Sequence, residues 1–466
     1  MAQGSIVLKD IAHPPEPEAA FRVLARDTHP FFLDSALKMP RIGRYSLLGS
    51  EPFLVMTSRG SDIRVTENGE TRTFEENPFY ALRDLLSRWT LPKHPDVPFL
   101  GGAVGYLSYD LGHFVEQLPC TTVDDIRLPE LYMAFHDTAL VYDHVEERAW
   151  VVAADLDIPG RNLADTRASR LIEKLSAPSS PTSKTEEKPF NEIRCNFTKE
   201  EYLRAVQRVK DYIAAGDIFQ VNLSRRFETT LTLPPEELYL KLRAINPAPM
   251  AAYFAFDDCA VVSASPERFI KVRGGHAETR PVKGTRPRGK NETEDRALAE
   301  ELVASEKDNA ELAMIVDLER NDFGRVCSYG SVQVTEPRVL ESFPTVHHLV
   351  ATVEGELHEG HDLVSLLRAT FPGGSITGAP KIRAMEIIDE LEPTRRSLYT
   401  GAIGYLGFDG GMDTSIVIRT FLIKGQTAYF QAGGGIVADS DLAAEYDETT
   451  HKARALLEAV SGKRNS

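Results

Sequence analysis

A carboxylate and an amine flank a glycine turn near the middle of the chain. Glu267 lies in SPERF (265–269) and Lys283 in RPVKGT (280–285), on either side of Gly274-Gly275. Two adjacent glycines between short apolar runs predict a β-hairpin. A three-residue loop would place the two side chains directly opposite, and a two-residue loop would place them diagonally. Such a pair suits acid–base or nucleophilic chemistry, and a surface cross-strand ion pair is the alternative.

Further carboxylates lie on two predicted helices. In the helix at 305–324, Asp308 and Glu311 are one turn apart on one face. In the helix at 443–460, Glu445, Glu448 and Lys452 have the spacing i, i+3, i+7. Two carboxylates on one face, joined by Glu354 or Glu311 from elsewhere, would suit Mg²⁺, which prefers oxygen ligands. An exposed helix face with salt bridges is the alternative.

Two glycine-rich segments could receive an anion. FPGGSITGAP (371–380) contains Ser375 and precedes a helical pattern, so free N–H groups at that helix start would face a carboxylate. QAGGGIV (431–437) contains three glycines, which let backbone amides approach an anion. Neither segment has the GxxxxGK[ST] spacing of a nucleotide loop.

The elements around these residues predict an α+β protein. A hairpin is expected at 138–155, a helix at 199–215 ending before Gly216, and antiparallel strands over 402–432. Regular βαβ alternation is missing, which argues against a doubly wound sheet. The segment 176–190 is rich in Ser, Pro and charge, so it is predicted to be a linker between regions 1–175 and 191–466.

Composition narrows the class of partner. The 466 residues are 42% hydrophobic and 26% charged, with a formal net charge of −16. Because phosphate backbones require a basic surface, a nucleic-acid partner is not expected. The sequence contains no uncharged apolar run long enough for a membrane span and no secretory pattern at its start, and its four cysteines are far apart. We therefore expect no membrane association and a cytoplasmic location.

Seven motifs in this order resemble the chorismate-utilising enzymes. They are SPERF, RPVKGTRPRG, MIVDLERNDFGRV, HHLVATVEG, FPGGSITGAPKIRAMEIIDELEP, GAIGYLGFDGGMDTSIVIRT and QAGGGIVADS with AEYDET. The family includes the large subunits of anthranilate and aminodeoxychorismate synthases and the isochorismate and salicylate synthases. The resemblance implies an anthranilate synthase component I-like fold, with large antiparallel β-sheets surrounded by helices.

Within the family, Lys283 separates the branches. Anthranilate synthases carry alanine at this position of the VKGT motif. Isochorismate and salicylate synthases carry lysine here, and so do aminodeoxychorismate synthases. HHLV, FPGGSITGAPK and NPAPMAAYF (246–254) also resemble the latter more than the isochorismate or salicylate synthases. The expected activity is therefore amination of chorismate, with anthranilate synthase or isochorismate/salicylate synthase as alternatives.

The resemblance also implies roles for single residues. Lys283 would be the nucleophile, Glu311 the general acid, and Glu267 would move protons or position the amine. Mg²⁺ would be held by Glu354, Glu445 and Glu448. Arg419 and Tyr399 would hold the enolpyruvyl carboxylate. The remaining predicted substrate contacts are Thr285, His348, Ser375, Gly434, Gly435 and Lys452.

A partner and a regulatory property follow from the same resemblance. The chain shows no glutaminase pattern, so ammonia would come from a separate glutamine amidotransferase subunit or from ammonium salts. Anthranilate synthases carry an LLES-like segment for tryptophan feedback, and here it reads LLGS at 47–50. We therefore expect weak or absent inhibition by tryptophan.

Overall fold

The computed structural model describes residues 2–39, 41–158, 160–161, 163–176, 192–343 and 346–461. Apart from Ser176, which ends a helix, the predicted linker at 176–190 lies outside the described residues. Among the described helices, none is both long and apolar enough to cross a membrane.

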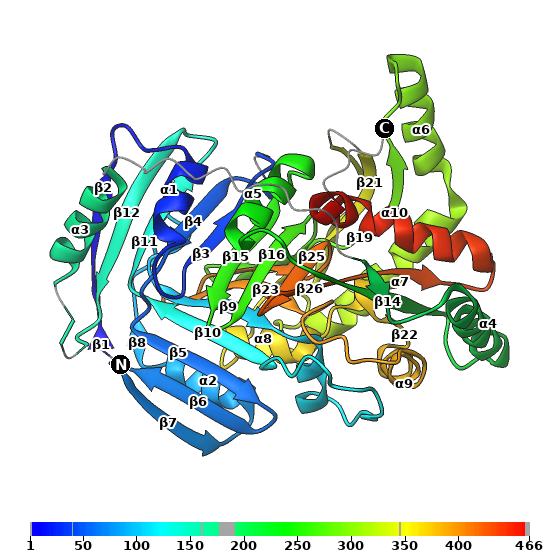
Figure 1. Ribbon diagram of the computed structural model, residues 1–466, viewed down its shortest axis with the longest axis horizontal. Coiled ribbons are helices and arrows are strands. Elements are labelled where there is room, and N and C mark those ends of the chain that lie inside the picture. Colours follow the sequence, from blue (N-terminus) through cyan, green and yellow to red (C-terminus); the bar gives the residue numbers. More distant parts are fainter. Residues whose placement is uncertain are drawn as a thin grey trace.

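Two large antiparallel sheets form the body of the molecule (Figure 1). The first follows the order β19 (Val282–Pro287), β21 (Val346–Glu356), β18 (His276–Thr279), β17 (Arg268–Arg273), β24 (Met412–Ile416), β23 (Ala402–Gly407), β9 (Gly102–Leu107), β10 (Leu131–His136), β5 (Leu54–Arg59), β6 (Asp62–Glu67) and β7 (Glu70–Glu75), with β20 (Gln333–Ser342) paired to β21.

The second sheet follows the order β13 (Arg194–Cys195), β14 (Gln220–Thr230), β26 (Thr427–Ile436), β25 (Thr420–Lys424), β16 (Cys259–Ser265), β15 (Met250–Phe256), β3 (Phe31–Asp34), β4 (Tyr45–Gly49), β11 (Thr138–Asp143), β12 (Arg148–Asp155) and β2 (Ser5–Asp10), with β22 (Gly378–Ala379) paired to β14. A short parallel pair, β1 (Ala2–Gln3) and β8 (Trp89–Thr90), stands apart.

Both sheets mix strands from the two predicted regions. In the first sheet β9 pairs with β23, and in the second β3 pairs with β15. The boundary expected near residue 176 therefore does not divide the molecule into two separate sheets. Gly105 shows how closely the strands are packed, because a Cβ there would lie 2.0 Å from the carbonyl oxygen of Tyr132.

Helices cover the outer faces of the sheets. They are α1 (Pro17–Leu24), α2 (Pro78–Leu86), α3 (Ala164–Ser176), α4 (Lys199–Ala215), α5 (Pro235–Ile245), α6 (Glu292–Ala304), α7 (Glu306–Gly324), α8 (Leu363–Thr370), α9 (Lys381–Leu391) and α10 (Leu442–Ser461), with short 3-10 turns at Tyr109–Phe114 and Gly374–Ile376. Helix α4 ends as predicted at Gly216, whose φ of 83° suits glycine.

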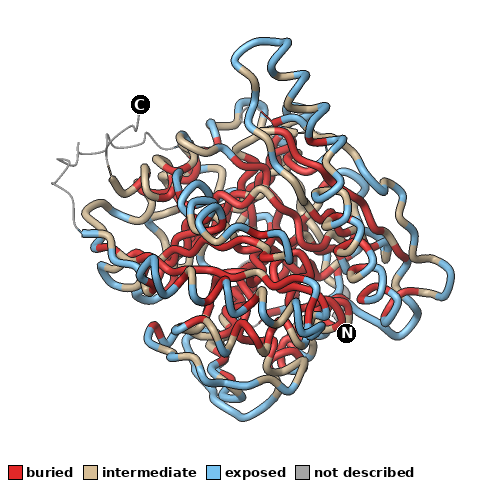
Figure 2. Tube along the Cα trace, turned by 90° about the vertical axis from the view of Figure 1, so that its right-hand side faces the viewer, coloured by how far each residue is buried: buried red, intermediate tan, exposed pale blue. Residues whose placement is uncertain are grey.

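Alternating side chains build separate cores on the two faces of the second sheet. Phe254 of β15 packs in a core shared with Tyr106 and Tyr132 of the first sheet, so this core lies between the sheets. Its neighbour Tyr253 points the other way, into a core with Phe21 of α1 and Leu238 of α5. Figure 2 shows these buried segments running through the interior of the molecule. The two-residue alternation is the expected pattern of a sheet covered on both sides.

The run at 414–423 lies where the sequence predicts antiparallel strands, and the structure divides it between two strands. Strand β24 belongs to the first sheet and β25 to the second, so the chain changes sheets between them. Arg419 lies at this break with a φ of 51°. Because a left-handed residue cannot continue a β-strand, the arginine is carried by a bend rather than by a strand.

Candidate active site

Strand β19 presents Lys283 through a β-bulge. Lys283 is opposite Leu349 of β21 and Thr285 is opposite His348, so the register shifts at Gly284. Gly284 has a φ of 72°, and a Cβ there would lie 2.8 Å from Leu302 and 3.0 Å from Asp308. A bulge redirects the neighbouring side chains, and only glycine satisfies both the backbone and the space here.

Ser375 joins the predicted amine to the predicted carboxylate. The Lys283 Nζ donates to the Ser375 carbonyl at 3.0 Å, and the Ser375 Oγ donates to Glu267 Oε1 at 2.7 Å. Burial raises the pKa of Glu267, while Ser375 and Lys283 oppose that rise. Burial also lowers the pKa of Lys283, and the charges of Glu311 and Glu267 oppose it. The two predicted partners are thus within electrostatic reach.

The hairpin itself does not bring Glu267 and Lys283 together, in contrast to the prediction. Arg273 pairs with His276, so the turn is the two-residue Gly274-Gly275 loop. Beyond Thr279 the chain leaves β17, and β19 pairs with β21 instead. Cross-strand pairing therefore does not position Glu267 against Lys283. The Ser375 loop does so, together with the bulge at Gly284.

Glu311 extends the group toward the last helix. It projects from α7, and burial raises its pKa. Lys283 and Lys307 oppose this rise, whereas the negative charge of Glu448 adds to it. Helix α7 thus carries a carboxylate, Glu311, that interacts electrostatically with both Lys283 and Glu448 of α10.

Helix α10 places its acids and lysine beside the glycine run. A Cβ on Gly434 would lie 3.2 Å from both Glu445 Oε2 and Glu448 Oε1. Lys452 Nζ lies 2.7 Å from Glu448 Oε1 and donates to the Gly433 carbonyl at 3.1 Å. The side chain of Glu448 is 47% exposed, and although partial desolvation opposes its ionisation, Lys452 outweighs this effect and the pKa of Glu448 is lowered.

The donor set at α10 suits a hard divalent cation. Glu445 is 5% exposed, and burial followed by the charge of Glu448 raises its pKa despite a hydrogen bond from Ser440. Its Oε2 is buried and has no hydrogen-bond partner among the described residues. As the side chains stand, no three His, Cys, Asp or Glu residues in the described chain form a shared ion site. Glu448 is instead ion-paired with Lys452.

Glu354, predicted as a metal ligand, does not join this acidic pair. It lies opposite Glu278 near the hairpin end of β21, and its Oε2 is 3.9 Å from His276 Nε2. Among the described residues, no hydrogen bond or ion pair joins Glu354 to Glu445 or Glu448. Glu354 is five positions along β21 from Leu349, which lies opposite Lys283, and a strand rises about 3.4 Å per residue, so Glu354 is far along the strand from the lysine. Glu311, the other option from the sequence, is the carboxylate near Glu448.

A second polar group lies next to the bulge. The Thr285 hydroxyl and His348 Nδ1 are 2.9 Å apart. Burial and the neighbouring charge of Arg419 lower the pKa of His348 to about 4, so the imidazole is neutral at physiological pH. No side-chain hydrogen bond or ion pair joins Arg419 to another described residue, and burial lowers its pKa. An enclosed guanidinium without a carboxylate suits an anionic ligand.

Two predicted contacts are packed within the protein. Tyr399 is 9% exposed, and the Arg396 guanidinium lies 5.7 Å from the centre of its ring. A Cβ on Gly435 would lie 2.0 Å from Gln220 Nε2, so the Gln220 side chain covers this glycine. Their predicted role in holding a carboxylate therefore remains a prediction.

Sequence reasoning missed one buried carboxyl in this region. Glu319 of α7 is 7% exposed and accepts a hydrogen bond from Thr279 Oγ1 at 3.1 Å. It lies two helical turns beyond Glu311, so the i, i+8 spacing could have placed it on the same face. Burial and the nearby charge of Glu267 raise its pKa to about 8.

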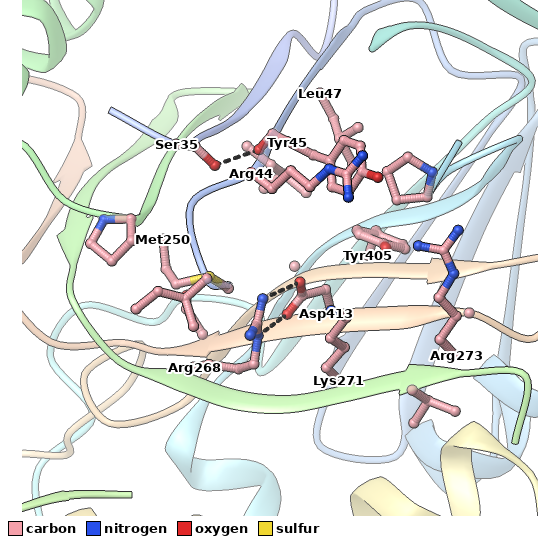
Figure 3. Close-up of a pocket in the computed structure, with 18 of the residues that line it drawn as sticks. Ser35, Arg44, Tyr45, Leu47, Met250, Arg268, Lys271, Arg273, Tyr405 and Asp413 are labelled. Atoms are coloured by element: carbon pink, nitrogen blue, oxygen red, sulfur yellow. Dashed lines mark hydrogen bonds and ion pairs between the residues drawn. The ribbon is translucent and has the colours of Figure 1, made fainter. Parts of the chain in front are cut away.

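A separate cavity of about 510 Å³ lies between the two sheets (Figure 3). Figure 3 shows Tyr45, Met250 and Tyr405 around it, with the Arg268–Asp413 ion pair on its wall. It is lined by Leu47 of the LLGS segment and by part of the NPAPMAAYF segment, but by none of the predicted site residues. The two motifs thus belong to a cavity that is distinct from the Lys283 group.

Known proteins resemble the chain over nearly its whole length. The family model for chorismate binding enzymes matches residues 45–458. Aminodeoxychorismate synthase component 1 of Bacillus subtilis (strain 168) is 42% identical over 439 residues, covering 93% of this chain and 92% of the relative. Anthranilate synthase component 1 of Thermus thermophilus is 43% identical over 448 residues, covering 95% of each chain.

A solved structure shows the same architecture. The crystal structure of anthranilate synthase component I from Streptococcus pneumoniae TIGR4 aligns with a TM-score of 0.78 at 33% identity, covering 91% of this chain and 93% of that one. The chain belongs to the family of chorismate binding enzymes. Its fold is the mixed α+β fold of anthranilate synthase component I, as the motifs predicted.

Proposed function

We propose that this chain is the chorismate-aminating component of an aminodeoxychorismate synthase, which forms 4-amino-4-deoxychorismate for 4-aminobenzoate and folate biosynthesis. The observation that carries the proposal is Lys283, a lysine with a lowered pKa beside Glu267 and Ser375. A lysine that loses its proton readily can act as a nucleophile, which divides a difficult substitution into two easier ones.

In the first step, the Lys283 amine bonds to C2 of the chorismate ring, the ring double bonds shift, and the C4–O bond breaks. Glu267 accepts the proton released by the attacking amine and passes it to the departing hydroxyl, which leaves as water. In the second step, ammonia bonds to C4, the double bonds return, and the C2–N bond breaks. The proton lost by the new amine restores the lysine, so atoms and charges balance.

The acidic residues divide between two tasks. The charge interaction between Glu311 and Glu448 supports Glu311 as a third carboxylate for Mg²⁺ beside Glu445 and Glu448, instead of Glu354. We therefore assign proton transfer to Glu267 in place of Glu311. When bound, the cation offsets the charge of the substrate ring carboxylate. Lys452 would leave Glu448 and contact the substrate.

Cationic and polar groups near the bulge would orient the rest of the substrate. The unpaired Arg419 suits the enolpyruvyl carboxylate, with Tyr399 and the Gly434–Gly435 backbone assisting. The Thr285 hydroxyl and neutral His348 offer hydrogen bonds to uncharged ring substituents. A separate glutamine amidotransferase subunit would supply ammonia, and the relatives named as component 1 support such a partner.

Anthranilate synthase component I is the second candidate. The Thermus thermophilus relative with that name is 43% identical, as similar as the aminodeoxychorismate synthase of Bacillus subtilis. The two activities differ in where nitrogen joins the ring and in whether the enolpyruvyl group is retained. The product therefore separates the two candidates.

The decisive test is incubation of the purified chain with chorismate, Mg²⁺ and an ammonium salt at about pH 8.5, without a partner subunit. Product is identified by mass and ultraviolet spectrum. Aminodeoxychorismate, converted to 4-aminobenzoate by an added lyase, supports the proposal. Anthranilate would show that Lys283 does not select the branch. Isochorismate or salicylate, formed equally well without ammonium, would place the chain among the water-using members.

A further inference from the structure

Glu319 is a buried carboxyl beside the reactive group that the proposed chemistry does not use. It lies on α7, is 7% exposed, and accepts one hydrogen bond, from Thr279 Oγ1. The largest charge effects on its pKa come from Glu267, its helix neighbour Asp322 and Lys381 of α9. It acts in turn on Lys283. A third carboxyl therefore lies near the lysine in addition to Glu267 and Glu311.

The two neighbouring carboxyls Glu267 and Glu319 are supported unequally. Glu267 accepts a hydrogen bond from the Ser375 hydroxyl, and the Val282 backbone and the charge of Lys283 also favour its ionised form. Glu319 has the Thr279 hydroxyl alone among the hydrogen-bond donors of the described residues.

Lys381 does little to offset this difference between the two carboxyls. Lys381 is already bonded to Asp322 Oδ2 and to the Thr370 carbonyl. Because two adjacent buried carboxyls cannot both ionise cheaply, the better-supported Glu267 takes the charge and Glu319 keeps the proton.

We propose that Glu319 is a positioning residue that remains a neutral acid at physiological pH and thereby prevents three carboxylates from surrounding Lys283. An ionised Glu319 would stabilise the ammonium form of the lysine and reduce the fraction of free amine. In its neutral form it confines the negative charge to Glu267, which touches Ser375. The catalytic meaning of this role rests on the proposed function, but the electrostatic role does not.

The same arrangement predicts how the titration of Lys283 depends on pH. Burial, and then the charge of Glu267, raise the pKa of Glu319 to about 8. Below that pH the residue is neutral and Lys283 loses its proton more easily. Above it, the new charge opposes loss of the proton from Lys283. The lysine should therefore titrate over a broader pH range than an isolated amine.

Competitive labelling with acetic anhydride measures this directly. The full chain is labelled between about pH 6 and 10 without chorismate, and mass spectrometry follows acetylation of Lys283 against an added reference amine. Glu319→Gln keeps the shape of the side chain but cannot ionise. We expect its Lys283 midpoint to fall by roughly 0.5 pH unit or more and its curve to sharpen to a single titration.

Two further variants complete the test. Asp317→Asn removes an exposed carboxylate from the same helix, whose side chain is 68% exposed, and should leave the midpoint unchanged. Thr279→Val removes the hydroxyl donor to Glu319 and should move the midpoint in the same direction by less. If Glu319→Gln unfolds, as judged by circular dichroism, the Lys283 midpoint of Thr279→Val decides whether the inference stands.

A Lys283 midpoint in Glu319→Gln that equals or exceeds the wild-type value would overturn the inference, as would an equal shift in Asp317→Asn. Since chorismate is absent, the product that the enzyme forms plays no part in this measurement. A wild-type chain that makes only anthranilate would refute the proposed function and leave this result standing.

Discussion

Two groups of enclosed charge lie close together in this molecule and differ in how fully they are paired. Arg396 donates to both carboxylate oxygens of Glu392 at 3.0 and 2.8 Å and to the carbonyls of Ile376 and Asn222. Glu392 also accepts from the backbone and hydroxyl of Ser224. Around Lys283, by contrast, the lysine donates to one carbonyl and Glu445 Oε2 has no described partner.

This difference in pairing distinguishes buried charges that stabilise the fold from buried charges that can take part in chemistry. A buried pair in which every donor and acceptor is satisfied holds segments together. The Arg396 pair ties β14 to the segments on either side of α9. Carboxyls and amines that are enclosed but incompletely paired have shifted pKa values, and they respond to a ligand, a proton or a metal. The Lys283 group has this second character.

The largest effect should come from Lys283→Ala. Removing the proposed nucleophile should reduce amination of chorismate with ammonium by about 10³-fold or more, with little change in unfolding temperature. The matched control is Lys271→Ala, which removes a lysine that lines the separate cavity, and it should retain activity. Steady-state kinetics of both variants provide the measurement. Equal losses in the two would remove the distinction between the sites.

Breaking the fully hydrogen-bonded Arg396–Glu392 pair should lower stability. Glu392→Ala leaves Arg396 and the Ser224 N–H without their carboxylate, so the free energy of unfolding should fall by about 3–5 kcal/mol. Arg320→Ala, which removes an exposed pair with Asp317, should cost about 1 kcal/mol or less. Urea denaturation compares the two. A small change in Glu392→Ala would mean that the buried pair is not what holds these segments.

The difference in stability between Glu319→Gln and the wild type should depend on pH. The pKa of Glu319 is raised to about 8, so the folded chain binds a proton that the unfolded chain releases at lower pH. This costs the wild type stability as pH rises from about 5 to 8, and the glutamine variant avoids that cost. We expect the variant to become more stable than wild type by a few kcal/mol toward pH 8, with no difference near pH 4. Denaturation curves across this range test the sign.

Glu448→Gln should weaken the response to magnesium. Losing one of the acidic ligands should raise the Mg²⁺ concentration for half-maximal activity by about 10–100-fold. Asp447→Asn changes an exposed carboxylate one residue away, on another face of α10, and should have no such effect. Magnesium titrations of activity distinguish them. An unchanged half-saturation in Glu448→Gln would exclude this residue as a ligand.

The smallest effect on the reaction rate should come from added tryptophan. Leu47 of the LLGS segment lines the separate cavity, but Gly49 is packed against Phe31, whose ring would lie 2.4 Å from a Cβ there. A glutamate at this position would therefore require the ring to move. We expect micromolar tryptophan to leave initial rates unchanged, and half-inhibition in that range would contradict the expectation.

Local patterns were sufficient for several parts of the site. The spacing of Glu445, Glu448 and Lys452 places them on one helix face, and three consecutive glycines let that face approach β26. The hairpin at Gly274-Gly275, the end of α4 at Gly216 and the helix after Pro380 also follow from single-residue preferences. These features depend on neighbours within about one turn or one strand, so the sequence carries their physical cause directly.

Other features depended on contacts between distant segments. The motifs identified the family and hence the fold, but only the tertiary structure decided that Glu311 lies near Glu448 and that Glu354 lies opposite Glu278. It also decided that Arg419 lies on a bend between the sheets and that Glu319 is enclosed beside Glu267. The reason is that strand register and burial arise from the whole packed molecule. The pKa of a carboxyl depends on what surrounds it, and the amino-acid sequence alone does not specify those surroundings at the level of single atoms.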